Sequence, residues 1–226
     1  MAQARVDVIS IGTLSRNLLW KESEAVRTPH ATTTLIRTAK RNILVDPGLP
    51  GSILAARLFE RTGLKPDAID TIFLTNARVA HRSGVNAFPS AKVLIHPTER
   101  ERVLLDLSVR IEDAEDDAER AALGAEARVL SSFKAAPDTL APQVDLFPLF
   151  GYTAGTCGIL VTLPTQTILL AGDAVASADH LLAGQVLPGC FDLSAAKASL
   201  TEVYEIADVV IPGHDNVLLN PRTYGS

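Results

Sequence analysis

Residues 74–84 read Leu-Thr-Asn-Ala-Arg-Val-Ala-His-Arg-Ser-Gly, and this stretch decides how the chain is interpreted. It follows an apolar run over residues 69–74 that is typical of a buried strand, and it leads into a turn at glycine. Loops after buried strands are where rigid scaffolds usually present side chains for chemistry. The loop contains one metal-ligand type of residue, His81, beside Asn76 and Arg78.

Strand and helix signals alternate on both sides of this loop. The patterns predict strands over residues 6–11, 33–38, 42–45, 69–74, 92–95, 159–162, 167–170 and 209–211, with hairpins at 39–41 and 163–166. Helices are predicted over residues 51–62, from Pro97 onward, and over 194–206 with Ser194 as N-cap. The acidic run 112–119 is interpreted as a solvated helix face or an insertion.

Two segments share one plan, although their registers differ slightly. Residues 35–48 and 159–173 each contain an apolar strand, a tight turn, a second apolar strand and then an Asp beside a Gly. The two acids are Asp46 and Asp173. This weak internal echo suggests two similar β-rich halves, each of which delivers a carboxylate from a strand end.

Four predicted strands therefore end in polar side chains that could bind a ligand. Asp46, the 76–81 loop, Asp173 and His214 follow them in chain order. Taken one at a time, each segment is weak evidence for a binding site, because an Asp or a His after a strand usually belongs to a turn or loop. Their order and spacing carry the argument.

The chain resembles the metallo-β-lactamase superfamily over nearly its whole length. The resemblance rests on five ordered motifs: Val45-Asp-Pro-Gly48, Asp70-Thr-Ile-Phe-Leu-Thr75 with its loop, Gly151-Tyr-Thr-Ala-Gly155, Leu170-Ala-Gly-Asp173 and Pro212-Gly-His214. It implies an α/β protein, an αββα four-layer sandwich with two mixed sheets and helices on the outer faces. We expect one domain over residues 1–226 with an acidic helical insertion at about 107–128. Members of the superfamily are mostly hydrolases that use two zinc ions.

The resemblance also assigns metal-ligand positions, and these are unevenly preserved. One metal of the family would be held at Asn76, Arg78 and Tyr152, none of which is a typical zinc ligand. The other would be held at the positions of Ala80, His81, Asp173 and His214, three of which keep ligand side chains. The pattern argues against a two-zinc site.

Three interpretations stay open, so catalytic activity and the catalytic residues are left undecided. His81, Asp173 and His214 suit a single zinc or iron ion with open positions, as in a mononuclear metallohydrolase. That mononuclear enzyme is the alternative, and the favoured interpretation is a metal-free protein in which Arg78 replaces a metal charge by pairing with Asp173 and with Asp46. If Asp46 does not pair with Arg78, we expect it to orient the 76–81 loop through hydrogen bonds. The third interpretation is an interaction or structural protein on the same fold.

Composition narrows the partners. The chain has 226 residues, a net charge of −5 and no basic patch, which argues against nucleic acid. No apolar run is long enough for a bilayer, no secretory signal is evident, and the two cysteines form no motif, so we expect a cytoplasmic protein. Arg78 and Arg82 favour a small, mildly anionic ligand. A homodimer is possible, because dimers are the commonest oligomers among soluble proteins.

Overall fold

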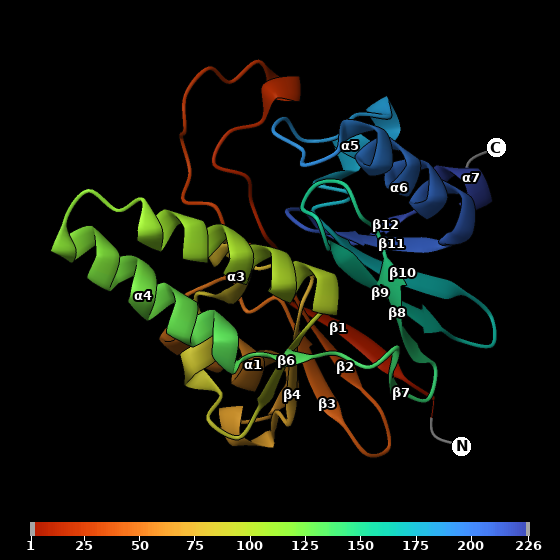
Figure 1. Ribbon diagram of the computed structural model, residues 1–226. Coiled ribbons are helices and arrows are strands. Elements are labelled where there is room, and N and C mark those ends of the chain that lie inside the picture. The colour runs from red at the N-terminus through yellow and green to blue at the C-terminus, as the bar shows by residue number, and fades with distance from the viewer. Residues whose placement is uncertain (1–2, 225–226) are drawn as a thin grey trace.

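The apolar segments assemble into two six-stranded sheets that pack face to face, with helices on both outer faces (Figure 1). This computed structural model describes residues 3–224, so the predicted domain 1–226 extends past the described residues at both ends. The layers run helix, sheet, sheet, helix. The predicted fold class is confirmed.

The first sheet has the order β1-β2-β3-β4-β5-β6. Its strands are β1 (Arg5–Ser10), β2 (Thr33–Arg37), β3 (Asn42–Val45), β4 (Thr71–Leu74), β5 (Lys92–Ile95) and β6 (Lys134–Ala135). The pairs β1–β2 and β2–β3 are antiparallel, whereas β3–β4, β4–β5 and β5–β6 are parallel. The sheet is therefore mixed, and the predicted hairpin at 39–41 joins β2 to β3.

The second sheet has the order β12-β11-β10-β9-β8-β7. Its strands are β7 (Thr139–Ala141), β8 (Val144–Pro148), β9 (Cys157–Thr162), β10 (Thr167–Gly172), β11 (Val209–Pro212) and β12 (Leu218–Leu219). Strands β9 and β10 form the second predicted hairpin, with Thr162 opposite Thr167. Strands β10 and β11 run parallel, which brings their carboxyl ends to one edge.

Three apolar clusters hold the layers together. The cluster between the sheets includes Phe73, Cys157 and Ile159, all fully buried. A second cluster joins the first sheet to α1 (Gly51–Thr62), α3 (Pro97–Glu112) and α4 (Asp117–Ser132). A third joins the second sheet to α5 (Ala178–Ala183) and α6 (Leu193–Ile206). The short elements are α2 (Val79–Arg82), α7 (Pro221–Tyr224), η1 (Leu18–Trp20), η2 (Pro66–Ala68) and η3 (Val85–Ala87).

Two local predictions need correction. Helix α6 is capped by Asp192, whose side chain accepts a hydrogen bond from the Ala195 amide, and not by Ser194. The helix predicted to begin at Pro97 is confirmed, but the insertion expected at about 107–128 is part of a longer hairpin that α3 and α4 form from residue 97 to 132 (Figure 1). The acidic run lies at its turn, where Asp116 caps α4 by accepting from the Glu119 amide.

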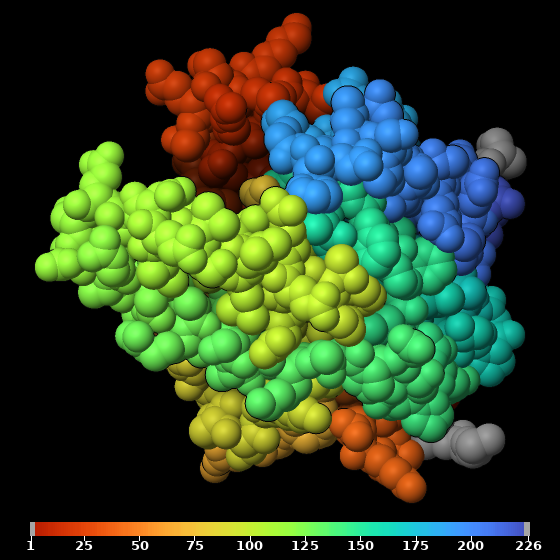
Figure 2. Space-filling view, in the orientation of Figure 1, coloured from red at the N-terminus to blue at the C-terminus, as the bar shows by residue number. Residues whose placement is uncertain are grey.

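Figure 2 shows the outer surface of this arrangement. The loop that contains η1 (red), helix α3 (yellow-green) and the segment around α5 (blue) border one side of the molecule. Among residues 3–224, no helix combines the length and the apolar character needed to cross a bilayer.

Candidate metal centre

The polar strand ends meet at one edge of the two sheets. Asp46 follows β3 and the loop containing His81 follows β4, which is parallel to β3. Asp173 follows β10, and His214 follows the parallel strand β11. Because parallel strands end on the same side, each sheet delivers one pair of side chains to this edge.

Two glycines let the strand ends approach one another there. Gly172 has a φ of +53°, and a Cβ on it would lie 2.5 Å from the Thr75 Oγ1 atom. A Cβ on Gly213 would lie 2.7 Å from the backbone of Gly172. Side chains at these positions would push the strand ends apart, so space requires glycine at both positions, and at Gly172 the positive φ requires it as well.

Asp173 is the centre of the cluster. Its Oδ2 atom lies 3.0 Å from Nε2 of His81, and its Oδ1 atom lies 2.9 Å from Nε2 of His214. All three side chains are buried. The expected ligand set His81, Asp173 and His214 is thus brought together by the fold.

His81 is held from its other side by a carboxylate. Its Nδ1 atom lies 2.9 Å from Oδ2 of Asp46. Asp46 in turn accepts hydrogen bonds from the amide of Thr75 at 2.8 Å and from its hydroxyl at 2.7 Å. Asp46 has a φ of +49°, a strained backbone angle for a residue with a side chain. This arrangement is the one in which a carboxylate fixes the ring orientation of a metal-binding histidine.

His214 is oriented by backbone carbonyls. Its Nδ1 atom lies 3.1 Å from the Thr13 oxygen and 3.0 Å from the His30 oxygen. Carbonyl oxygens only accept, so Nδ1 of His214 carries the proton. His30 therefore contributes its main chain here, while its own ring contacts the carbonyls of Thr28 and Ile11.

Electrostatics at the cluster are dominated by burial and mutual charge. Burial lowers the pKa of His81, but the nearby charges of Asp173 and Asp46 outweigh it and raise that pKa to about 10. Burial raises the pKa of Asp173, yet His81 and His214 together hold it well below its ordinary value. The carboxylate is therefore ionised across the neutral range.

One buried atom indicates what the cluster fits. Oδ1 of Asp173 is completely enclosed, and among residues 3–224 no aligned hydrogen bond reaches it, although His214 Nε2 lies nearby. A buried, unpartnered carboxylate oxygen is costly unless something else satisfies it. One ligand atom from each of His81, Asp173 and His214 lies within 4.8 Å of the others. The donor set is one that zinc and iron accept.

Asn76 points a hydrogen-bond donor, not a metal ligand, toward the cluster. Its Oδ1 accepts a hydrogen bond from the Arg78 amide, so its NH₂ group points inward. That group donates to Oδ2 of Asp173 at 3.0 Å and lies 3.3 Å from Nε2 of His81. A donor here orients the carboxylate and leaves no lone pair for a second metal.

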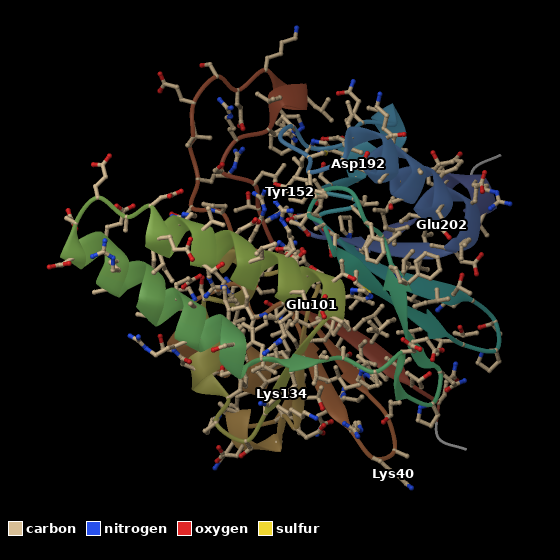
Figure 3. The ribbon with its side chains drawn as sticks, viewed as in Figure 1. Lys40, Glu101, Lys134, Tyr152, Asp192 and Glu202 are labelled. Carbon is tan, nitrogen blue, oxygen red and sulfur yellow. The ribbon has the colours of Figure 1, made fainter. Side chains whose placement is uncertain are left out.

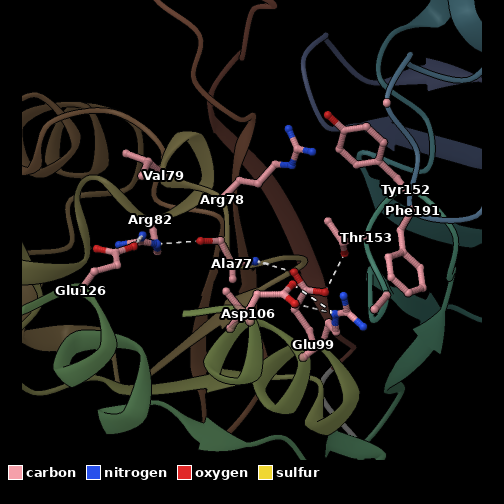
Figure 4. Close-up of a pocket in the computed structure, with 14 residues that line it drawn as sticks. Ala77, Arg78, Val79, Arg82, Glu99, Asp106, Glu126, Tyr152, Thr153 and Phe191 are labelled. Carbon is pink, nitrogen blue, oxygen red and sulfur yellow. Dashed lines mark hydrogen bonds and ion pairs between the residues drawn. The ribbon is translucent and has the colours of Figure 1, made fainter. Parts of the chain in front are cut away.

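Arg78 does not pair with either carboxylate, which corrects the prediction that it replaces a metal charge. Its guanidinium stacks over the ring of Tyr152, 4.4 Å from the centroid, and the residue is exposed (Figure 4). Among the described residues no ion pair joins Arg78 to Asp173 or Asp46. The reason is geometric: Arg78 precedes the short helix α2 and its side chain extends outward, past the buried cluster.

Tyr152 is buried and lies where the helical hairpin meets the second sheet (Figure 3). Burial and the charge of Asp173 raise the pKa of Tyr152 to about 12, so its phenol is neutral. Asn76, Arg78 and Tyr152, the three positions that the resemblance assigned to one metal, are therefore not all turned toward one point. Asn76 faces the cluster, whereas Arg78 and Tyr152 line an adjacent cavity.

Glu99 is a buried residue whose role the sequence did not reveal. Its carboxylate accepts hydrogen bonds from the amide of Ala77 at 3.0 Å and from the hydroxyl of Thr153 at 2.6 Å (Figure 4). It also accepts one from the amide of Gly155 at 3.0 Å. It thereby ties the loop after β4 to the loop before β9. Its position two residues after Pro97, in a helical first turn, was the available signal, but the partners are distant in sequence.

The remaining histidines have local roles. His96 caps α3 by accepting a hydrogen bond from the Thr98 amide. His180 is buried, and its Nδ1 atom lies 2.7 Å from the Ser177 hydroxyl. Neither belongs to the group of metal-ligand side chains found among residues 3–224.

Comparisons with known proteins agree with this architecture. Residues 27–214 match the family described as the metallo-beta-lactamase superfamily, and the chain belongs to that superfamily. The predicted family membership is confirmed. A search of curated proteins found no match.

Solved structures share the fold at low identity. A metallo-beta-lactamase-like protein from Thermotoga maritima has 17% identity and a TM-score of 0.69, over 96% of this chain and 99% of that one. A probable metal-dependent hydrolase from Staphylococcus aureus has 14% identity and a TM-score of 0.69, over 95% and 90%. AidC, a dizinc quorum-quenching lactonase, has 21% identity and a TM-score of 0.61, over 77% and 67%. At such identities the likeness shows the fold alone.

Proposed function

We propose that this protein is a mononuclear metallohydrolase whose cation is held by His81, Asp173 and His214. The supporting observation is the orientation of the two imidazoles. Each ring is fixed through Nδ1 by acceptors, Asp46 for His81 and two carbonyls for His214. Both Nε2 atoms consequently face one buried, ionised carboxylate. Without a metal, the raised pKa of His81 keeps a proton between its ring and the carboxylate. A cation that displaces this proton would find three ligand atoms within 4.8 Å of one another.

When bound, a divalent zinc or iron ion would lower the pKa of a water molecule toward about 7 and polarise a carbonyl or phosphoryl oxygen. The chain supplies the rest of the chemistry. Asp46 and Thr75 keep the His81 ring in place, and the amide of Asn76 fixes the Asp173 carboxylate. Arg78 and Tyr152, at the neighbouring cavity, would position the substrate. Ala80 offers no carboxylate in the loop, so the two-metal reaction of the family is not proposed.

The metal-free alternative has lost its main support. It required Arg78 to neutralise Asp173, and the guanidinium stacks on Tyr152 instead. An interaction protein on the same fold would not need two oriented histidines around a buried Asp. Both alternatives nevertheless define the outcomes that would overturn the proposal.

Metal content tests the proposal directly. The protein would be purified without chelators, supplied with zinc, iron or manganese, desalted and analysed for metals. We expect about one equivalent per chain, as for three protein ligands with open coordination positions. His214→Ala should fall far below that value, whereas His96→Asn, a histidine outside the cluster, should keep it. Metal well below one equivalent in the unaltered protein would overturn the assignment.

Catalysis is tested separately on the loaded protein. Hydrolysis of 4-nitrophenyl esters and of bis(4-nitrophenyl) phosphate would be followed before and after chelation. We expect activity that disappears with a chelator and returns with metal. A fully loaded protein that hydrolyses neither class, while His214→Ala matches it, would argue against a hydrolase.

A further inference from the structure

The cavity beside the cluster has a volume of about 420 Å³ and is lined from three directions. The loop after β4 contributes Arg78 and Val79, helix α3 contributes Arg102 and Val103, and the segments around Tyr152 and Phe191 close the far side (Figure 4). Val79 and Phe191 are exposed apolar side chains, at 61% and 58%. Its walls therefore combine apolar surface with charged groups.

The charges on this wall are mostly committed to one another. Arg82 pairs with Glu126 and also donates to the Ala77 carbonyl at 2.7 Å. Arg102 pairs with Asp106 at 2.9 Å. The formal charges of the three arginines and three acids that line the cavity sum to zero, but these side chains are not equally accessible.

Glu99 is the acid without a cationic partner, and it is withdrawn from the cavity. It is 4% exposed, and both of its oxygens accept hydrogen bonds from the two loops that it joins. Among the described lining residues, Arg78 is then the charged group that is both exposed and without an ion-pair partner. The cavity presents one available positive charge.

That charge is held in place. The Tyr152 ring lies under the guanidinium at 4.4 Å, and Tyr152 is itself buried. The backbone amide of Arg78 donates to Asn76, whose NH₂ group contacts Asp173. A stacked guanidinium keeps its N–H donors at the ring edge free, in the planar fork that matches carboxylate and phosphate groups.

We infer that this cavity is the substrate-binding site and that it selects substrates carrying an oxyanion, a carboxylate or phosphate, next to an apolar portion. Arg78 binds the oxyanion, while Val79, Val103 and Phe191 contact the apolar part. The hydrolysed bond lies toward His81 and Asp173. The inference rests on the proposed function for its role in a reaction, but binding of the oxyanion does not require metal.

The test uses two probes of equal shape, 3-phenylpropionate and 3-phenylpropanamide, on chelator-treated protein. Binding would be measured by calorimetry or by chemical-shift titration. We expect the carboxylate to bind about tenfold more tightly than the amide, as one charge-assisted, bidentate contact would give. Inorganic phosphate should compete with the carboxylate for the site.

Two variants locate the charge. Arg78→Gln should abolish the preference for the carboxylate. Arg128→Gln removes the same charge from an exposed position on α4 and should leave the preference intact. Equal binding of both probes to the unaltered protein, or an undiminished preference in Arg78→Gln, would overturn the inference. Arg78 is exposed, so the folded state of the variant is readily confirmed by its melting temperature.

Failure of this inference is distinguishable from failure of the proposed function. Metal binding and ester hydrolysis without oxyanion preference would leave the hydrolase in place and remove the specificity. Oxyanion binding at Arg78 without metal uptake would keep the binding specificity and remove the metallohydrolase.

Discussion

Nδ1 of His81 lies 2.9 Å from the carboxylate of Asp46, so this ring presents its other nitrogen to the cluster. Asp46 is anchored by two hydrogen bonds from Thr75 and adopts a positive φ to reach them. The contact joins the ends of two parallel strands, β3 and β4. It makes the orientation of the histidine a property of the first sheet, independent of any ligand.

Replacing Asp46 by Asn should weaken metal binding by about 10- to 100-fold, the usual effect of losing such an outer partner. Asn tolerates the positive φ, so the backbone cost is small. The side-chain NH₂ group of Asn would face a hydrogen-bond donor of Thr75 or His81, where Asp46 now offers an acceptor. Zinc affinity by competition with a chromophoric chelator measures the effect. Asp67→Asn, an exposed change in η2, serves as the control; equal affinities in both variants would contradict the role of Asp46.

Replacing Glu99 by Gln should destabilise the protein by about 1–3 kcal/mol, because an NH₂ group would face donors in a buried site. Denaturant unfolding measures the change. Glu101→Gln, on the exposed side of α3 (Figure 3), should alter stability little. Similar unfolding curves for the two variants would show that Glu99 does not tie the loops together.

The metal-free protein should lose stability as the pH rises from about 6.5 to about 10. The folded pKa of His81 is about 10, above the ordinary histidine value, so the folded state binds a proton that the unfolded state releases first. This contribution is complete below the unfolded pKa and disappears as the pH passes the folded pKa. Melting temperatures of chelator-treated protein and of His81→Asn measure it. The variant should lack this part of the slope; parallel curves would contradict the prediction.

The two cysteines should differ in reactivity. Cys157 is fully buried between the sheets, and burial raises the pKa of its thiol to about 12. Cys190 is half-buried in the loop before α6. Because thiolate and access both control the rate, a chromogenic disulfide reagent should label Cys190 first in native protein and Cys157 upon unfolding. Labelling of native Cys190→Ser at the rate of the unaltered chain would show that Cys157 is accessible.

Adding a methyl group at Gly172 should disrupt the meeting point of the sheets. Its Cβ would overlap Thr75, and its φ of +53° disfavours any side chain. We expect Gly172→Ala to lower both thermal stability and metal content. Gly124→Ala, in the middle of α4, where the nearest atom would lie 3.6 Å away, should instead be neutral or stabilising. Full metal content in Gly172→Ala would contradict the tight fit.

Much of the fold followed from local patterns. Apolar runs predicted both hairpins, and the helix at 51–62 ended at Gly63 as its left-handed C-cap requires. The prediction of the N-cap residue of α6 was wrong because Asp192 and Ser194 are both good N-cap residues. The local sequence does not distinguish between two such residues so close together. The start of α3 at Pro97 was predicted correctly, but the expected insertion at about 107–128 was too narrow, since exposed helices carry weak apolar periodicity.

The sequence by itself determined the superfamily and the strand-end positions of Asp46, His81, Asp173 and His214. These depend on residue identity and order along the chain. The tertiary structure decided where the side chains point: Asn76 toward Asp173, Arg78 away from it and onto Tyr152, and Glu99 between two loops. Those contacts join residues up to 97 positions apart. They depend on the packing of the two sheets, which local sequence patterns do not encode.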